Sequence, residues 1–168
     1  YQSTFTLHLE SIPLDKYIEF AQMHFREYGK VVDAGLVEVI YLSFEGITLY
    51  LQMLMNEVFL LTEKGGTATS AYFEMALASL VRKQNFIYQS IFADLTERQR
   101  EILRAIAAEN VAANVTSGEF VRRYHLKSPS SVQSALKGLS GKGMVGKTLD
   151  GYVINDRLFR FWIKRNPI

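Results

Sequence analysis

Residues 128–154 read SPSSVQSALKGLSGKGMVGKTLDGYVI, and this stretch decides the fold of the C-terminal half. Ser128 followed by Pro129 is typical of a helix start, because serine accepts hydrogen bonds from free amide groups and proline suits the first helical position. The apolar residues that follow are spaced three and four apart, which predicts a helix with one buried face. They are Val132, Ala135, Leu136 and Leu139.

The rest of this stretch predicts a β-hairpin. Glycines at positions 141 and 143 end the helix, and residues 144–148 and 152–154 have the character of short strands. Asp150-Gly151 between them is a strong signal for a tight hairpin turn. A helix followed directly by a hairpin is therefore expected.

Two more helices are expected upstream of this stretch. Thr96 and Gln99 form a T-x-x-Q capping box, and Thr116 with Glu119 forms a second box. An amphipathic segment at residues 158–163 follows the hairpin. Helix, helix, tight turn, helix and hairpin is the order of a winged helix-turn-helix domain, which we predict for residues 95–168.

Residues 1–94 predict one strand followed by a helical unit. Residues 4–9 alternate polar and apolar side chains, as a strand does. Apolar residues at helical spacing then predict helices at 14–28, 34–44, 48–61 and 70–92. The predicted fold class is therefore mainly α, with a helical bundle followed by a winged helix-turn-helix domain that carries a small β-hairpin wing.

Aromatic and methionine side chains form two conspicuous groups. One is on the expected third helix, and the other surrounds Trp162 near the C-terminus. A cluster of exposed aromatic residues can anchor a partner, but packing in the core is the commoner role, and we expect it for both groups. The residues are Tyr50, Met53, Met55, Phe59, Phe159, Phe161 and Trp162.

The net charge of +2 conceals an asymmetry between the two halves. Residues 1–95 carry six basic and eleven acidic side chains, a balance of −5, whereas residues 96–168 carry thirteen basic and six acidic side chains, a balance of +7. A change of charge along the chain indicates a domain boundary, and the basic half is the candidate for contact with a polyanion. Small basic domains that bind no nucleic acid are also common.

The sequence excludes several classes of function. No G-x-x-x-x-G-K-[ST] or G-x-S-x-G motif occurs, and the three histidines are scattered without metal-ligand spacing, so we expect no catalytic or metal site. The lack of cysteine rules out disulfides and fits a reducing cytoplasm. No signal peptide or membrane-spanning stretch is evident. Because the chain opens at Tyr1 without a methionine, we expect it to be part of a larger protein.

Binding is the role that the sequence favours. In a helix-turn-helix domain the second helix of the motif enters the major groove of DNA with its outward face. That face is small and polar here, and glutamine suits adenine while serine and lysine suit phosphate. It lacks arginine, the residue that most often contacts guanine, so a solvated face or a face that packs on a protein stays open. The DNA-binding candidates are Ser130, Ser131, Gln133, Ser134, Lys137, Lys142, Lys147, Arg122 and Arg123.

Several short motifs resemble the C-terminal part of archaeal-type AAA+/STAND P-loop ATPases. Ile12-Pro13-Leu14-Asp15 is similar to the end of the ATPase module, and the stretch from Phe44 to Gln52 is similar to a G-x-P-x-Y-x-x-Q helix of the lid subdomain. Leu95-Thr96-Glu97-Arg98-Gln99 resembles the family's winged-helix opening, and Asn155 to Trp162 resembles its D-P-L-F-x-x-W ending. Thr48 and Arg157 each stand where the family has proline.

The resemblance implies that a P-loop domain precedes Tyr1 and that the strand at residues 4–9 completes its sheet. It also implies ATP and Mg²⁺ as ligands of the parent protein, with the lid helix near the nucleotide. The lid positions carried over from the family are Gly46, Thr48, Tyr50 and Gln52. No arginine occurs between Lys30 and Lys64, so a sensor arginine is not evident in that stretch.

Two hypotheses therefore remain for the basic half. In the first, it is the output arm of a regulated ATPase and contacts double-stranded DNA. In the second, it is a protein-interaction or autoinhibitory module that docks on the missing nucleotide-binding domain, on another chain or on a second copy, drawn by the opposite charges of the two halves.

Overall fold

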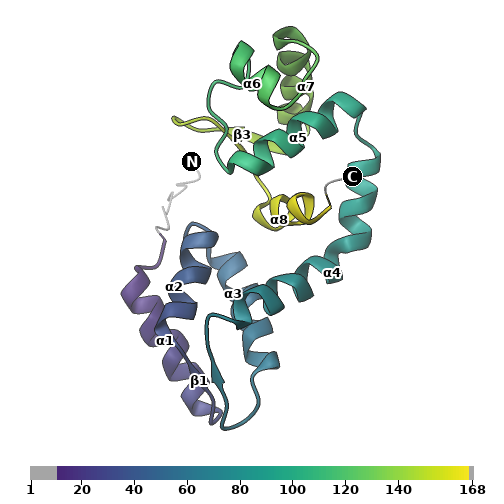
Figure 1. Ribbon diagram of the computed structural model, residues 1–168. Coiled ribbons are helices and arrows are strands. Elements are labelled where there is room, and N and C mark those ends of the chain that lie inside the picture. Colours follow the sequence, from purple (N-terminus) through teal and green to yellow (C-terminus); the bar gives the residue numbers. More distant parts are fainter. Residues whose placement is uncertain (1–10, 167–168) are drawn as a thin grey trace, which may run out of the picture. The chain divides into compact units, whose positions relative to one another are not determined.

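The computed structural model describes residues 11–166, so the strand expected at residues 4–9 lies outside the described part. The described chain is mainly α-helical, with eight helices and two small two-stranded sheets, which confirms the predicted fold class (Figure 1). Its contacts divide it into two compact units, and the division along the chain falls between Leu80 and Val81. Among residues 11–166, no helix combines the length and the apolar character needed to span a bilayer.

The first unit, unit 1, is built from helices whose positions the apolar spacing predicts to within about two residues. Its core consists of side chains from all of them, among them Leu36, Ile40, Leu51, Leu54 and Leu77, which are fully buried. The helices are α1 (Leu14–Glu27), α2 (Ala34–Ser43), α3 (Thr48–Leu61) and the long α4 (Tyr72–Ala93), whose second half belongs to the other unit.

A short parallel strand pair in unit 1 was not predicted. The strand β1 (Val31–Val32) pairs with β2 (Thr67–Ala68), with Val31 opposite Thr67 and Val32 opposite Ala68. Two residues are too few to show an alternating pattern, and the partners are more than thirty positions apart. Only the packing of the helices between them brings these segments together.

The second unit, unit 2, follows the predicted order of a winged helix. Its elements are α5 (Glu97–Glu109), α6 (Gly118–Arg123), α7 (Pro129–Gly141), β3 (Val145–Lys147), β4 (Tyr152–Ile154) and α8 (Arg157–Arg165). The strands β3 and β4 are antiparallel and form the hairpin expected around Asp150-Gly151. Thr48 and Arg157, the two departures from the ATPase pattern, are each the first residue of a helix, a position that suits proline without requiring it.

Side-chain caps explain where the helices of unit 2 begin. The capping box predicted at Thr96 and Gln99 is present, with both of its hydrogen bonds formed. The box predicted at Thr116 and Glu119 is wrong by one residue. The hydroxyl of Ser117 caps α6 by accepting a hydrogen bond from the amide of Phe120 at 3.1 Å. A turn closed by the bond from the Ser117 amide to the carbonyl of Asn114 sets this start, and the sequence alone does not reveal that turn.

In the aromatic group around Trp162, Phe159 and Trp162 lie in the core, as predicted, whereas Phe161 is only half-buried. Trp162 and Phe159 on α8 are buried and pack against Tyr88 on α4, and the indole nitrogen of Trp162 donates to Asn85 Oδ1 at 2.8 Å. The second half of α4 therefore shares the core of unit 2. The sequence placed the boundary between residues 94 and 95, whereas the contacts of the chain divide inside α4, because these side chains are packed on α8.

Candidate nucleic-acid interface

The helix-turn-helix consists of α6, a five-residue turn and α7. The turn is tight because His125 adopts a left-handed backbone conformation, with φ of 52°. The amide of Leu126 then donates to the carbonyl of Val121 at 2.9 Å, and the Leu126 side chain is buried. Ser128 closes the turn by capping α7 through its hydroxyl, which accepts from the amide of Ser131 at 3.2 Å.

The two faces of α7 differ as the apolar spacing predicts. Val132, Ala135, Leu136 and Leu139 are buried, and the helix packs mainly on α5. The opposite face carries small polar and basic side chains that are exposed to solvent. They are Ser130, Gln133, Ser134, Lys137 and Ser140.

Ser131 belongs to the start of α7 more than to its outward face. Its hydroxyl donates to the carbonyl of Ser128 at 2.8 Å and accepts from the amide of Ser128 at 3.1 Å. The residue is only half-exposed. A hydroxyl engaged in a capping box has little capacity left for a ligand, so among the predicted serines, Ser134 and Ser130 are the better placed.

The wing is the β3–β4 hairpin, and its tip is exposed. In the hairpin Lys147 lies opposite Tyr152, and its ammonium group is 5.9 Å from the centre of the Tyr152 ring. The turn is closed by a hydrogen bond from the amide of Thr148 to the carbonyl of Gly151 at 2.8 Å. Leu149, at the tip, is fully exposed.

A third segment holds the wing in place. Ala112, in the connection between α5 and α6, forms an isolated antiparallel bridge with Tyr152, and two hydrogen bonds of 2.9 Å join their backbones. Gly151 lies so close to this connection that a β-carbon would be 2.4 Å from the carbonyl oxygen of Ala112. The orientation of the wing relative to α5 therefore depends on the absence of a side chain at residue 151.

An open groove of about 590 Å³ lies between α7 and the wing. From α7 it is lined by Gln133 and Lys137, and from the wing by Lys147 and Leu149. Among the described residues that line it, Asp150 is the only acidic one. The structure thus brings three predicted binding residues, Gln133, Lys137 and Lys147, to one concave surface.

Sequence reasoning missed the floor of this groove. It is formed by the connection between α5 and α6, including Ala113 and Asn114, and by Ser140 near the end of α7. Asn114 has a left-handed backbone, with φ of 49°, which turns this connection toward α6. An asparagine in a short loop is a weak signal for such a turn, and a single bridging residue such as Ala112 gives no periodic signal at all.

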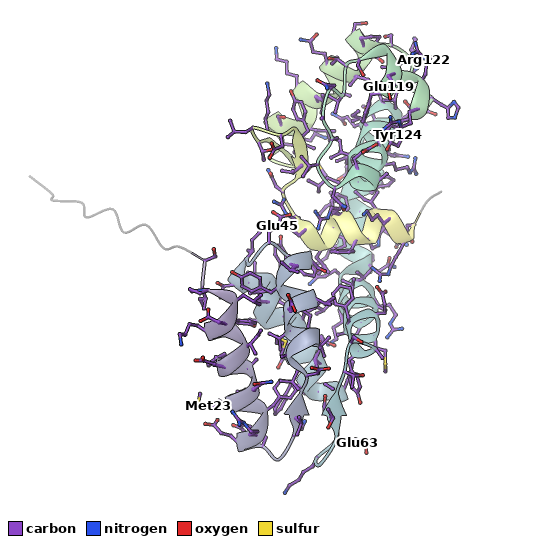
Figure 2. The ribbon with its side chains drawn as sticks, turned by 60° about the vertical axis from the view of Figure 1, so that its left-hand side comes forward. Met23, Glu45, Glu63, Glu119, Arg122 and Tyr124 are labelled. Carbon is purple, nitrogen blue, oxygen red and sulfur yellow. The ribbon has the colours of Figure 1, made fainter. Side chains whose placement is uncertain are left out.

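The remaining predicted cations do not line the groove. Arg123 lies in a polar network on α6, where its guanidinium contacts Glu109 at 3.0 Å and Glu119 at 2.6 Å. Figure 2 shows Glu119, Arg122 and Tyr124 at this end of unit 2. Arg122 and Lys142 are exposed, Arg122 on α6 and Lys142 just after α7.

Glu109 is the centre of that network. The hydroxyl of Tyr124 and the guanidinium of Arg123 both donate hydrogen bonds to its Oε1, and these bonds lower the pKa of the Glu109 carboxyl. Burial, together with the same bond to Glu109, raises the pKa of the Tyr124 hydroxyl. Arg123 is therefore held by two carboxylates, which makes it a poorer phosphate ligand than its position in the sequence suggests.

The four lid positions carried over from the ATPase resemblance lie in unit 1. Gly46 has φ of +69°, and a β-carbon there would be 2.8 Å from the Tyr41 hydroxyl oxygen; Figure 2 labels its neighbour Glu45. Thr48 is the first residue of α3, and the Tyr50 ring is 5.3 Å from that of Phe44.

The fourth position, Gln52, lines an apolar cavity of about 360 Å³ between α1 and α3, together with the rings of Phe20, Tyr28 and Phe59. Within residues 11–166, no three histidine, aspartate or glutamate side chains are placed to hold a metal ion.

The comparison with protein families agrees with the geometry of unit 2. Residues 86–165 match the model of a family described as a probable winged helix domain. The matched residues include the second half of α4, which packs on α8, and they end at the last residue of α8. The match does not reach unit 1, and no finding relates the chain to the AAA+ or STAND ATPases. No curated protein matches the chain.

Proposed function

We propose that unit 2 binds double-stranded DNA, with α7 in the major groove and the wing on the adjacent backbone. The observation that carries this proposal is the groove between α7 and the wing, which Gln133, Lys137 and Lys147 line from two different elements. Helix-turn-helix proteins place the second helix of the motif in the major groove, where its exposed residues contact base edges.

The chemistry of the groove assigns a role to each of these residues. The Gln133 amide both donates and accepts hydrogen bonds, so it can pair with N6 and N7 of adenine. Lys137 and Lys147 are exposed ammonium groups that neutralise phosphates. Phosphate contacts position a protein on DNA without reading its sequence, so Gln133 is the residue expected to carry base preference.

The net charge supports the same assignment. Residues 96–168 have a balance of +7, which favours the approach of a polyanion over a long range. This balance includes the ion-paired Arg123, which lies outside the groove, and the positive charge within the groove comes from Lys137 and Lys147. Asp150 at the wing tip opposes a close approach of phosphate there.

Fluorescence anisotropy with a labelled duplex of mixed sequence tests the proposal at low salt. Lys137→Glu is expected to weaken binding by about tenfold or more, because an attraction becomes a repulsion, and Lys147→Glu is expected to act in the same direction. Lys64→Glu changes an exposed charge in unit 1 and is the matched control, with little effect expected. Failure of the wild-type chain to bind, or unchanged binding by Lys137→Glu, would contradict the proposal.

We also propose, from the motif resemblance, that the chain is the C-terminal part of an AAA+/STAND ATPase that binds ATP and Mg²⁺ elsewhere. The support is the similarity of residues 44–52 and 155–162 to that family's motifs. A P-loop motif in the residues that precede Tyr1 tests it. If α7 instead docks on such a nucleotide-binding domain, Lys137→Glu weakens that contact and the DNA titration shows no binding.

A further inference from the structure

A cavity of about 360 Å³ between α1 and α3 has the properties of a small-molecule binding site. Every residue that lines it belongs to unit 1. Its floor is apolar and buried, and it consists of Tyr17, Phe25 and Met55. At its rim the side chains of Phe20 and Tyr28 are 54% and 56% exposed. Pockets of about 300 to about 1,000 Å³ with aromatic walls and a few polar groups are those that bind small organic ligands.

The aromatic rings of the cavity hold one another in place. The Phe59 ring packs edge-to-face with Phe25 and with Tyr28, at 5.2 Å and 5.3 Å between ring centres. The rings of Phe20 and His24 are parallel to within 4°, with their centres 6.1 Å apart. A planar aromatic ligand adds one more ring to this set and buries the exposed area of Phe20 and Tyr28. Because the rings are already ordered by their neighbours, little conformational entropy is lost when the ligand binds.

Two amide side chains supply the polar groups of the cavity. Gln52 and Asn56 are four residues apart on α3, so they lie on the same face of that helix. Both line the cavity and both are exposed. Within residues 11–166, neither side-chain amide has a hydrogen-bond partner. Each offers two donor hydrogens and one acceptor oxygen, and these match an amide or lactam group of a ligand.

The charges around the cavity favour a neutral ligand. Among the described residues that line it, none is lysine, arginine, aspartate or glutamate, so a phosphate or carboxylate has no counter-ion there. The ammonium group of Lys30 lies 3.9 Å from the centre of the Phe59 ring and donates to the Phe59 carbonyl at 2.7 Å. This ammonium group repels a cationic ligand at the same ring. His24 Nδ1 is 3.6 Å from Glu27 Oε2, so a positive charge on His24 is matched by a carboxylate of α1 itself.

We propose that this cavity binds a neutral, planar aromatic molecule that carries an amide or lactam group. The ring of the ligand lies among Phe20, Tyr28 and Phe59, and its amide group bonds to Gln52 and Asn56. The triphosphate of a nucleotide has no partner in this cavity, so the ligand class differs from the ATP proposed for the parent protein. The ligand contacts both α1 and α3, and its binding therefore stabilises unit 1. The inference concerns unit 1 alone and does not depend on whether unit 2 binds DNA.

Benzamide, benzoate and benzamidinium have the same shape and differ in charge, so together they test this assignment. Each compound is added to the isotope-labelled whole chain, and the side-chain amide signals of Gln52 and Asn56 are followed by NMR. Benzamide is expected to shift these signals with a dissociation constant of about 1 mM, which is the range of a ligand of this size. Benzoate and benzamidinium should each bind about fivefold more weakly or worse, because neither charge has a partner in the cavity.

Two substitutions and a control show where the compounds bind. Asn56→Asp replaces an exposed amide by a carboxylate, so benzamidinium should bind about tenfold more tightly than to wild type while benzamide binds more weakly. Phe20→Ser removes a half-exposed ring from the rim and should weaken benzamide binding by about fivefold. Met23→Ser alters a residue that is exposed on α1 but does not line the cavity, and it should change nothing (Figure 2). Circular dichroism checks that each variant folds.

Each other result overturns the proposal. A wild-type spectrum that does not change with benzamide up to about 20 mM excludes the site. Equal affinity for the three compounds means that the cavity does not recognise an amide, and tighter binding of either charged compound by wild type contradicts the argument from charge. Binding that both substitutions leave unchanged belongs to another surface. A failure of the DNA titration does not affect these results, because every substitution used here lies in unit 1.

Discussion

At the scale of single residues, Gly151 holds the wing against the rest of unit 2. It has φ of +154°, and a β-carbon would lie 2.4 Å from the Ala112 carbonyl oxygen, a backbone atom with little freedom to move. Both the conformation and the contact exclude a side chain. With a side chain at residue 151, the wing would have to bend away from Ala112, or the bridge between Ala112 and Tyr152 would be lost.

Gly151→Ala is therefore expected to destabilise unit 2 by about 2–3 kcal/mol, and the loss comes from backbone strain and steric overlap. Gly141→Ala is the matched control, because no atom lies within 4 Å of its β-carbon and alanine suits a helix end; it should be neutral or slightly stabilising. Denaturant titration followed by the fluorescence of Trp162, the only tryptophan, measures both variants. Equal stabilities would disprove the steric argument.

Tyr17 is a second residue whose surroundings decide its chemistry. Tyr17 is a residue of α1 and its side chain is buried. Burial raises the pKa of its hydroxyl to about 12. In the unfolded chain a tyrosine ionises near pH 10. The contribution of Tyr17 to stability is therefore complete below about pH 10 and is lost as the pH rises from about 10 to about 12.

Tyr17→Phe removes this ionisation, so the variant should gain about 2 kcal/mol of stability relative to wild type between about pH 9 and about pH 11.5. Urea unfolding followed by circular dichroism at the two pH values measures the difference. The other tyrosines titrate in both proteins and cancel in the comparison. A constant difference across this range would show that Tyr17 ionises normally in the folded chain.

At the scale of elements, α7 depends on its N-terminal cap for both its position and its exposed face. The hydroxyl of Ser128 accepts a hydrogen bond from the amide of Ser131, and the hydroxyl of Ser131 accepts one from the amide of Ser128. The helix therefore begins directly at the end of the turn from α6. Its outward residues then face the wing across the groove. Loss of the cap frays the first turn of α7, which carries Ser130, and should leave Lys137 in the middle of the helix in place.

Ser128→Ala is expected to cost about 1 kcal/mol, the usual value of a serine cap. Ser134→Ala removes an exposed hydroxyl from the middle of the same helix and should raise stability by a few tenths of a kcal/mol, because alanine has the higher helix propensity. Hydrogen exchange of the α7 amides, read together with denaturant titration, tests the pair. Equal effects of the two substitutions would mean that the cap contributes nothing.

At the scale of the whole molecule, the separation of charge should govern how binding responds to salt. Four predicted cations are exposed and outside the Glu109 network, namely Arg122, Lys137, Lys142 and Lys147. If each neutralises one phosphate, the logarithm of the binding constant should fall with the logarithm of salt concentration with a slope of about −3.6.

Replacing any one of these four cations by glutamine should make the slope less negative by about 0.9. Arg123→Gln should change the slope little, because Arg123 is already paired with two carboxylates. Anisotropy titrations at four or more salt concentrations give the slopes. A slope near zero, or an effect of Arg123 as large as that of Lys137, would contradict the assignment of the cations.

The sequence by itself determined the features that depend on neighbours along the chain. Helix spacing placed the helices to within about two residues, the caps at Thr96 and Ser128 were recognised, and Asp150-Gly151 located the wing. The face of α7 that is exposed followed from the same periodicity. Each of these signals is a local preference of the backbone or of hydrogen bonding within one turn, so a single sequence reveals it.

Only the tertiary structure decided the features that join distant residues. It paired β1 with β2, placed Ala112 beside Tyr152, packed α4 on α8, and engaged Arg123 with Glu109. It also joined Gln133, Lys137 and Lys147 in one groove. The physical reason is that these contacts arise from the packing of whole elements against one another. The identity of a residue does not indicate which residue, dozens of positions away, it will contact.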